Sequence, residues 1–257
     1  MLSAIRAHDG ETVHAYFLSR SEDQFLCPEC KAEVVLKTGQ RRINHFAHAV
    51  PLACKFALGE SDDHRQCKLE IYRALQKTLG VEDLALERSL SWGRPDVSAR
   101  IRGVPVAIEV QISSLSVETI QKRTIEYGRN GIYVLWLLQW RPELEDSRYR
   151  PTNWEKWLHA AYFGRVYYWI EGSTVASYNF EPSIRSVPKA SWISKKGKEM
   201  TAGGYSRRLK SFRTAVRGPT FNFATDFVPR QRYWWSGNGV TVPDAKLFMD
   251  PGLSIVS

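Results

Sequence analysis

Two segments in the middle of the chain, residues 59–140, have the hydrophobic spacing of helices. The first begins at Ser61, whose hydroxyl can cap a helix with acids in its first turn, and it ends before Gly80. The second begins at Ser116 and ends near Gly128. The sequence therefore predicts two helices, with a long stretch of other structure between them.

Apolar and polar residues alternate along that intervening stretch, which is the pattern of half-buried strands. Residues 83–92, 96–101 and 106–112 each follow it. After the second helix, residues 132–138 form an unbroken apolar run, typical of a strand buried on both faces. The order α-β-β-β-α-β, ending in a βαβ crossover, predicts an α/β fold.

The two flanking regions have a different character. Residues 1–58 have the pattern of short strands and turns with little core of their own. Within residues 141–257, an aromatic helix and a hairpin precede segment 185–217, which is basic and rich in Ser and Gly. This composition predicts partial disorder there. We expect three regions: 1–58, 59–140 and 141–257.

Charge and composition narrow the class of protein. The chain has 257 residues and a net charge of +9; residues 1–150 contribute +1 and residues 151–257 contribute +8. A basic region beside a near-neutral one suggests a polyanionic partner, most simply nucleic acid, or else a solubilising tail. No apolar run approaches the ~20 residues of a membrane span, and the start of the chain lacks the apolar stretch of a signal peptide. We therefore expect a cytoplasmic protein whose four cysteines are thiols or metal ligands.

Two close pairs of metal-binding residues lie in the first region. Cys27 and Cys30 are separated by two residues, as are His45 and His48. A Cys-x2-Cys turn directs both sulfurs to one point, and a second close pair can complete a tetrahedral zinc site. The spacing predicts a zinc-ribbon-like module, with Cys54 able to replace one histidine. The alternative is that the cysteines are free thiols and the histidines pack.

Two carboxylates fall opposite each other if the strands pair as a hairpin. Along residues 106–112, the apolar residues share one face, whereas Glu109 and Gln111 share the other. A turn at Arg102–Gly103 pairs residues whose numbers sum to 205, which places Asp96 opposite Glu109 at a Cβ distance of ~5 Å. Like charges so close need a neutralising partner, and carboxylate oxygens suit Mg²⁺ or Mn²⁺. Ordinary surface acids are the alternative interpretation.

The first helix contributes a third carboxylate. His64 and Cys67 lie on a stripe that extrapolates back to Glu60, and Lys68 lies one turn from His64. The sequence therefore predicts that Glu60 joins the paired acids.

Several of these motifs occur together, and in the same order, in a known family. Arg94-Pro95-Asp96-Val97 followed by Glu109-Val110-Gln111 resembles the PD-(D/E)xK nuclease signature, with Gln111 in the usual lysine position. With Cys27-Pro28-Glu29-Cys30, His45-Phe46-Ala47-His48 and Glu60-Ser61, the chain resembles the competence protein CoiA-like family over about residues 15–170. The resemblance implies a restriction-endonuclease-like core in residues 59–140.

The resemblance also implies roles for individual residues. Asp96 and Glu109 would bind the catalytic Mg²⁺ or Mn²⁺, Glu60 would be the acid on the helix, and Gln111 would orient the phosphate or the attacking water. Lysine at that position supplies positive charge, whereas Gln111 can only donate a hydrogen bond. Lys68 or Arg123 could supply the missing charge.

The predicted function is metal-dependent hydrolysis of DNA phosphodiester bonds, in the handling of incoming DNA during transformation or recombination. The alternatives are a non-catalytic nucleic-acid-binding protein and a zinc-stabilised protein-interaction module. The residues expected to contact DNA are basic or aromatic: Lys68, Arg123, Tyr127, Lys195, Lys196, Arg207 and Arg208.

Overall fold

The computed structural model describes residues 1–257 except 20–21, 40–41, 51–53, 55–59, 147 and 253–257. The boundary expected between residues 58 and 59 lies outside the described residues. Within them, the helices are α1 (Asp62–Gln76), α2 (Val117–Arg129) and α3 (Asn153–Ala161), with 3-10 turns η1 (Ala15–Phe17) and η2 (Pro142–Glu145). None of the described helices is long and apolar enough to cross a membrane.

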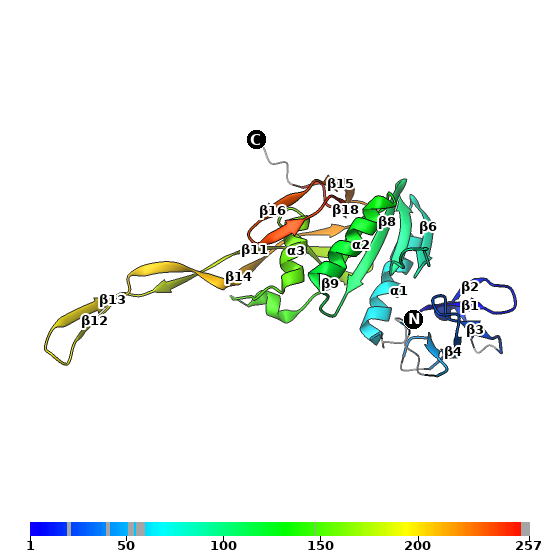
Figure 1. Ribbon diagram of the computed structural model, residues 1–257, viewed down its shortest axis with the longest axis horizontal. Helices are drawn as coiled ribbons and strands as arrows, with labels where there is room; N and C mark the ends of the chain where they lie inside the picture. Colours follow the sequence, from blue (N-terminus) through cyan, green and yellow to red (C-terminus); the bar gives the residue numbers. More distant parts are fainter. Residues whose placement is uncertain (20–21, 40–41, 51–53, 55–59, 147, 253–257) are drawn as a thin grey trace.

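A large mixed sheet forms the centre of the molecule (Figure 1). Its strands run in the order β14-β11-β10-β9-β8-β7-β6, and β18 pairs with both β9 and β15. The strands are β6 (Val81–Leu86), β7 (Val97–Ile101), β8 (Val104–Gln111), β9 (Tyr133–Gln139), β10 (Val166–Glu171), β11 (Thr174–Val187), β14 (Tyr205–Asn222), β15 (Val228–Arg232) and β18 (Ala245–Met249). The central strands β8, β9 and β10 are parallel, whereas β6, β7 and β8 form an antiparallel meander.

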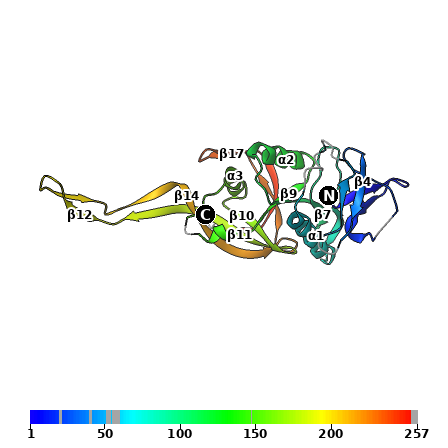
Figure 2. The same ribbon diagram turned by 90° about the horizontal axis from the view of Figure 1, so that it is seen from below.

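The predicted α-β-β-β-α-β order is confirmed as α1-β6-β7-β8-α2-β9. Both predicted caps form: the Ser61 hydroxyl accepts from the amide of His64, and the Ser116 hydroxyl accepts from the amide of Thr119. Helix α1 covers one face of the sheet, and α2 and α3 cover the other (Figure 2). Strand β9 is buried between the two layers, as its apolar run predicts.

The β7–β8 hairpin has the predicted register. Val97 pairs with Ile108 and Ile101 pairs with Val104, so every pair sums to 205. The two turn residues, Arg102 and Gly103, have φ values of 49° and 79°, as the favoured two-residue hairpin turn requires. This register brings the end of the loop before β7 beside Glu109.

The N-terminal module consists of β1–β5 and Cys54, and it forms a separate small sheet. Its strands run in the order β2-β1-β3-β4-β5, with bounds β1 (Ser3–Arg6), β2 (Thr12–His14), β3 (Phe25–Leu26), β4 (Glu33–Lys37) and β5 (His45–His48). Few large apolar side chains, among them Phe25, Val34 and Phe46, fill its core, and Cys27 and Cys54 complete it. Such a small core suits a module that a metal ion stabilises.

Residues 185–217, where the composition predicts partial disorder, have the conformation of a long β-hairpin arm in the structure. The arm comprises the outer parts of β11 and β14 and, at its tip, the hairpin of β12 (Ala190–Ile193) and β13 (Glu199–Ala202), as Figure 1 shows. Its glycines serve turns: Gly203 has a φ of 86°, and a Cβ there would clash with the carbonyl oxygen of Pro188. The composition of the segment indicated mobility, whereas in the structure its glycines form turns.

A last small hairpin, β16 (Trp235–Gly237) and β17 (Val240–Val242), packs against α3 near the place where the arm leaves the sheet (Figure 1).

Candidate active site and metal-binding clusters

The start of α1 carries three of the predicted polar residues. Because Ser61 is the N-cap, Glu60 lies just before the helix, and His64 and Lys68 follow at intervals of one turn on the same side. His64 Nδ1 lies 3.2 Å from Glu60 Oε1, and the Lys68 ammonium pairs with the same carboxylate. The extrapolation from the apolar stripe to Glu60 is therefore confirmed.

Asp96 completes this group from the other side. It lies directly before β7, where its Oδ2 accepts a hydrogen bond of 2.9 Å from the backbone N–H of Val110 on β8. The same oxygen is 3.3 Å from His64 Nε2, and Oδ1 is 3.6 Å from Lys68 Nζ. One ligand atom each from Glu60, His64 and Asp96 lies within 4.8 Å of the other two, so these residues could hold a metal ion.

Glu109 has different partners. Its carboxylate is 1% exposed and accepts hydrogen bonds from the Arg123 guanidinium and the Tyr127 hydroxyl, both on α2. Arg123 and Tyr127 are one turn apart, so they face the same sheet edge, as predicted. Glu109 is not a member of the Glu60–His64–Asp96 group. Asp96 and Glu109 therefore lie in two adjoining clusters, one around each carboxylate, and the metal site predicted between them stays a prediction.

The electrostatics of the two carboxylates are opposite. Burial acts to raise the pKa of Asp96, but the positive charge of Lys68 and the hydrogen bond to His64 outweigh it and hold that pKa well below its usual range. Burial also raises the pKa of Glu109, in this case to about 7, and the negative charge of Asp96 adds to the effect while Arg123 opposes it. The hydrogen bond from the Val110 backbone to Asp96 places the Asp96 cluster beside Glu109. Asp96 is therefore the permanently ionised member of the pair.

Two residues expected to contact DNA lie too deep to do so. Lys68 and Tyr127 are 2% and 1% exposed, and both are engaged by carboxylates of the two clusters. Lys68 forms ion pairs with Asp96 and Glu60, and Tyr127 donates a hydrogen bond to Glu109. Arg123 differs, because its side chain is 35% exposed and therefore accessible from solvent.

Gln111 lies on the predicted face of β8, next but one to Glu109. Its side-chain amide donates to the carbonyl oxygen of Ser113 at the end of the strand, and its residue is 9% exposed. The amide is therefore held in one orientation. It supplies none of the charge that a lysine would bring to this position.

The sequence interpretation missed Glu87, which is buried behind the Asp96 cluster. Its Oε1 lies 2.5 Å from Lys68 Nζ, and its Oε2 accepts from the backbone amides of Leu2 and Ser3, 3.0 Å each, and pairs with Arg94. Glu87 thus joins the N-terminal module to the candidate active site. Glu87 belongs to no sequence motif. In the structure it is distinguished by a left-handed backbone, with a φ of 47°, directly after β6.

The second metal-binding cluster lies in the N-terminal module. Cys27, Cys30, His48 and Cys54 each offer a ligand atom within 4.8 Å of the others. The Cys27 and Cys54 sulfurs are 3.9 Å apart, and Cys30 Sγ is 3.3 Å from His48 Nε2. Both separations are within about 0.2 Å of the edges, about 3.5–3.8 Å long, of a tetrahedral site built from ordinary Zn–S and Zn–N bonds. A Cys3His cluster of this geometry could hold zinc.

His45 does not take part in that cluster, and Cys54 takes its place. His45 and His48 both lie on β5, and residues three apart on a strand point to opposite faces. The His45 ring lies instead 2.8 Å from the carbonyl oxygen of Ile43 through Nδ1. The Cys-x2-Cys pair sits in a tight turn after β3, closed by a backbone hydrogen bond from Lys31 to Cys27.

Two thiols of this cluster have pKa values that are shifted in opposite directions from the ordinary value of a thiol. Burial raises the pKa of Cys27 to about 11, whereas the backbone N–H of Ala32 lowers the pKa of Cys30 to about 7. A bound cation would favour the thiolate form at every sulfur.

The predicted DNA-contacting residues of the basic segment lie on the arm. Lys195, Lys196, Arg207 and Arg208 are all exposed. Arg185 and Arg207 face each other across β11 and β14, an arrangement that repels unless an anion lies nearby.

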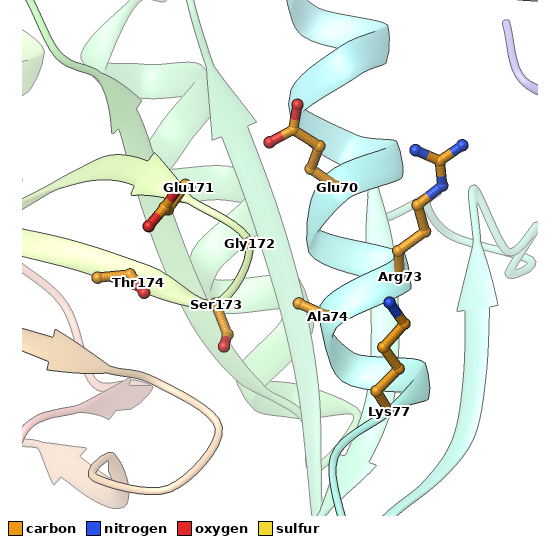
Figure 3. Close-up of a pocket in the computed structure, with 8 residues that line it drawn as sticks. All are labelled: Glu70, Arg73, Ala74, Lys77, Glu171, Gly172, Ser173 and Thr174. Carbon is orange, nitrogen blue, oxygen red and sulfur yellow. The ribbon is translucent and has the colours of Figure 1, made fainter.

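A groove of about 400 Å³ lies between α1 and the β10–β11 turn (Figure 3). Its α1 residues, among them Glu70, Arg73 and Lys77, occupy the helix face opposite His64 and Lys68. Arg73 points away from the turn, and Glu70 and Glu171 balance the basic side chains. The mixed charge and the separation from both clusters distinguish this groove from the candidate active site.

Comparison with known proteins identifies a nuclease-like domain preceded by an N-terminal domain that contains the cysteine cluster. The family description "Competence protein CoiA, nuclease-like domain" matches residues 60–165, and "Competence protein CoiA, N-terminal domain" matches residues 10–57. The chain belongs to the CoiA-like family.

A curated relative from Bacillus subtilis (strain 168), "Competence protein CoiA", is 31% identical over 116 residues. The match covers 45% of this chain and 31% of the relative, so the two share about a third of the relative's length. No solved structure matches the chain. The arm and the strands beyond residue 165 lie outside both matched domains.

Proposed function

We propose that this protein is a metal-dependent nuclease that hydrolyses DNA phosphodiester bonds, with a restriction-endonuclease-like core formed by α1-β6-β7-β8-α2-β9. The observation that carries the proposal is the convergence of Glu60, His64 and Asp96 within 4.8 Å, beside Glu109. In a chain with a nuclease-like domain, the carboxylate oxygens of Glu60 and Asp96 are suited to Mg²⁺ or Mn²⁺.

The donor set fits a divalent cation in its chemistry. Lys68 and His64 hold Asp96 in its ionised form, and the Glu60 carboxylate faces the same point, with Oε1 3.2 Å from His64 Nδ1. A divalent cation bound there would lower the pKa of a water molecule and neutralise phosphate charge.

The protein's own residues perform the remaining tasks. The Asp96 carboxylate is fixed by the backbone of Val110, so it needs no rearrangement to act as a ligand. The half-exposed Arg123 can pair with a phosphate while it orients Glu109. Gln111, held by Ser113, can donate only a neutral hydrogen bond, so Arg123 is the residue that supplies positive charge toward the substrate.

The other two regions serve binding and stability in this proposal. Zinc held by the Cys3His cluster stabilises the N-terminal module, whose own core is small. The exposed cations of the arm, among them Lys195, Lys196 and Arg207, bind DNA without sequence preference. Membership of a competence family suggests DNA taken up by the cell as the substrate.

A non-catalytic DNA-binding protein is the second candidate, and one observation favours it. The Lys68 ammonium already lies against Glu60, Glu87 and Asp96, where it neutralises the carboxylates that a metal ion would need. In that case DNA binding persists without hydrolysis.

Cleavage assays decide between the two candidates. Single-stranded, duplex and branched DNA are incubated with the protein in Mg²⁺, Mn²⁺ or EDTA. Asp96→Asn and Glu109→Gln should abolish cleavage, and Asp96→Asn should weaken Mn²⁺ binding measured by calorimetry. Asp63→Asn, at an exposed acid of the same first turn of α1, is the matched control and should cleave normally. A wild type that binds DNA but cuts none of the DNA forms with either ion would favour the second candidate.

A further inference from the structure

A cleft of about 850 Å³ lies at the base of the arm, far along the sheet from α1. Its lining residues come from helix α3, from β11 and the proximal part of β14, and from the segment between β15 and β17. Its size falls within the range of about 300–1,000 Å³ that is typical of ligand pockets. Neither the Asp96 cluster nor the Cys3His cluster contributes to it.

The lining of this cleft is strongly basic. It contains five cationic side chains and no aspartate or glutamate; the cations are Lys156, Arg208, Lys210, Arg213 and Arg232. Throughout the described residues, none of the five forms an ion pair with a carboxylate. Five uncompensated charges around one cleft repel each other, and an anionic ligand would relieve that repulsion.

Arg232 is the best-defined anion receptor among them. Its guanidinium carbon lies 4.2 Å from the ring centre of Phe163 and 5.3 Å from that of Trp235. Its Nε is buried and has no hydrogen-bond partner among the described residues. Two aromatic rings thus hold the guanidinium in place while part of its hydrogen-bonding capacity stays unused.

Phe163 presents an aromatic ring to the same cleft. It directly follows the C-cap of α3, and its left-handed backbone, with a φ of 54°, belongs to the turn that ends the helix, where the Gly164 N–H donates to the carbonyl oxygen of His159. Its side chain is 49% exposed, so part of the ring is open to solvent beside Arg232.

We propose that this cleft binds single-stranded DNA, with Arg232 pairing with a phosphate and Phe163 stacking on a base. Cations beside exposed aromatic rings are the usual means of binding single strands, whereas a duplex hides the faces of its bases. Arg208 and Lys210 lie two residues apart on β14, which continues into the basic arm, and this row of cations favours a polymer over a free nucleotide. The inference rests on DNA as the ligand in the proposed function, but not on its cleavage.

Fluorescence anisotropy with a labelled 15-residue oligothymidylate tests the proposal. The measurements use the full chain in EDTA on an Asp96→Asn background, so that binding is scored whether or not the protein cuts DNA. Arg232→Gln should weaken binding about tenfold, the cost of one charged hydrogen bond. The slope of log affinity against log salt should fall by about 0.7 for each lost phosphate contact. Binding of a duplex of the same length should change less than twofold.

Two further variants keep the test decisive. Lys156→Gln alters an exposed side chain whose hydrogen bond goes to Asn153 of the same helix, so it should preserve the fold and should also weaken oligothymidylate binding. Arg129→Gln removes the same charge from an exposed position on α2 and should bind like the parent. Parent-like binding by both Arg232→Gln and Lys156→Gln would overturn the proposal. So would equal displacement of the oligomer by inorganic phosphate at matched phosphate concentration, which would assign the cleft to free phosphate.

Discussion

Replacing Lys68 by methionine probes the electrostatic balance of the candidate active site. The Lys68 ammonium is buried against three carboxylates, at 2.5 Å from Glu87 and 3.6 Å from Asp96, with Glu60 as the third. At 3.6 Å, the attraction to Asp96 alone is about 5 kcal/mol with an effective dielectric constant of about 20. Removing one partner of a buried ion pair typically costs about 3–5 kcal/mol, because the other charge is left uncompensated. Since three carboxylates lose a partner, we expect Lys68→Met to lower the free energy of unfolding by about 5 kcal/mol.

A metal ion should reverse part of this loss. Mn²⁺ at about 100 times its Kd stabilises a folded protein by about 2.7 kcal/mol. Lys68→Met should bind Mn²⁺ more tightly than the wild type, because the ammonium no longer competes for the same oxygens. Urea unfolding with and without Mn²⁺ measures both effects, with Lys77→Met, an exposed lysine of the same helix, as the control. A loss below about 1 kcal/mol, or equal stabilisation of variant and wild type by Mn²⁺, would refute the reasoning.

Three further predictions concern the other regions. Cys54→Ser should lose zinc and His45→Asn should retain it, as measured by elemental analysis, because Cys54 and not His45 belongs to the cluster; the opposite pattern would restore the His-x2-His site. Glu87→Gln weakens the pairing with Lys68 and Arg94 and should make the N-terminal module more sensitive to limited proteolysis, whereas unchanged digestion would show that Glu87 does not join the two regions. Replacing residues 188–204 by a short turn should weaken duplex binding and reduce the salt slope by about 0.9 per lost phosphate contact, and an unchanged slope would show that the arm tip makes none.

Local signals were sufficient to predict the central elements. Ser61 and Ser116 each cap a helix, and both caps form. The hairpin register follows from the turn at Gly103 and the alternation in β8, because a shift by one residue would turn the apolar face to the wrong side. From these two features alone, Asp96 and Glu109 could be placed in adjoining positions.

Features that depend on distant parts of the chain could not be predicted. Cys54 joins Cys27 and Cys30 only because the module folds back on itself, and its spacing to them fits no motif. Glu87 draws its partners from the first residues of the chain and from α1, so no local pattern distinguishes it from a surface acid. The arm was missed for a different reason, since glycines that specify turns have the same composition as glycines in a flexible segment.

The position of Gln111 explains why the positive charges of this site are divided between two helices. A lysine at that place on β8 would neutralise the neighbouring carboxylates and also face the phosphate. Here Lys68 on α1 neutralises Asp96 from within the core, where no phosphate can reach it, and Arg123 on α2 remains accessible beside Glu109. The two tasks therefore belong to separate residues. An Arg123 variant should affect substrate binding and turnover, whereas a Lys68 variant should first affect stability and metal affinity.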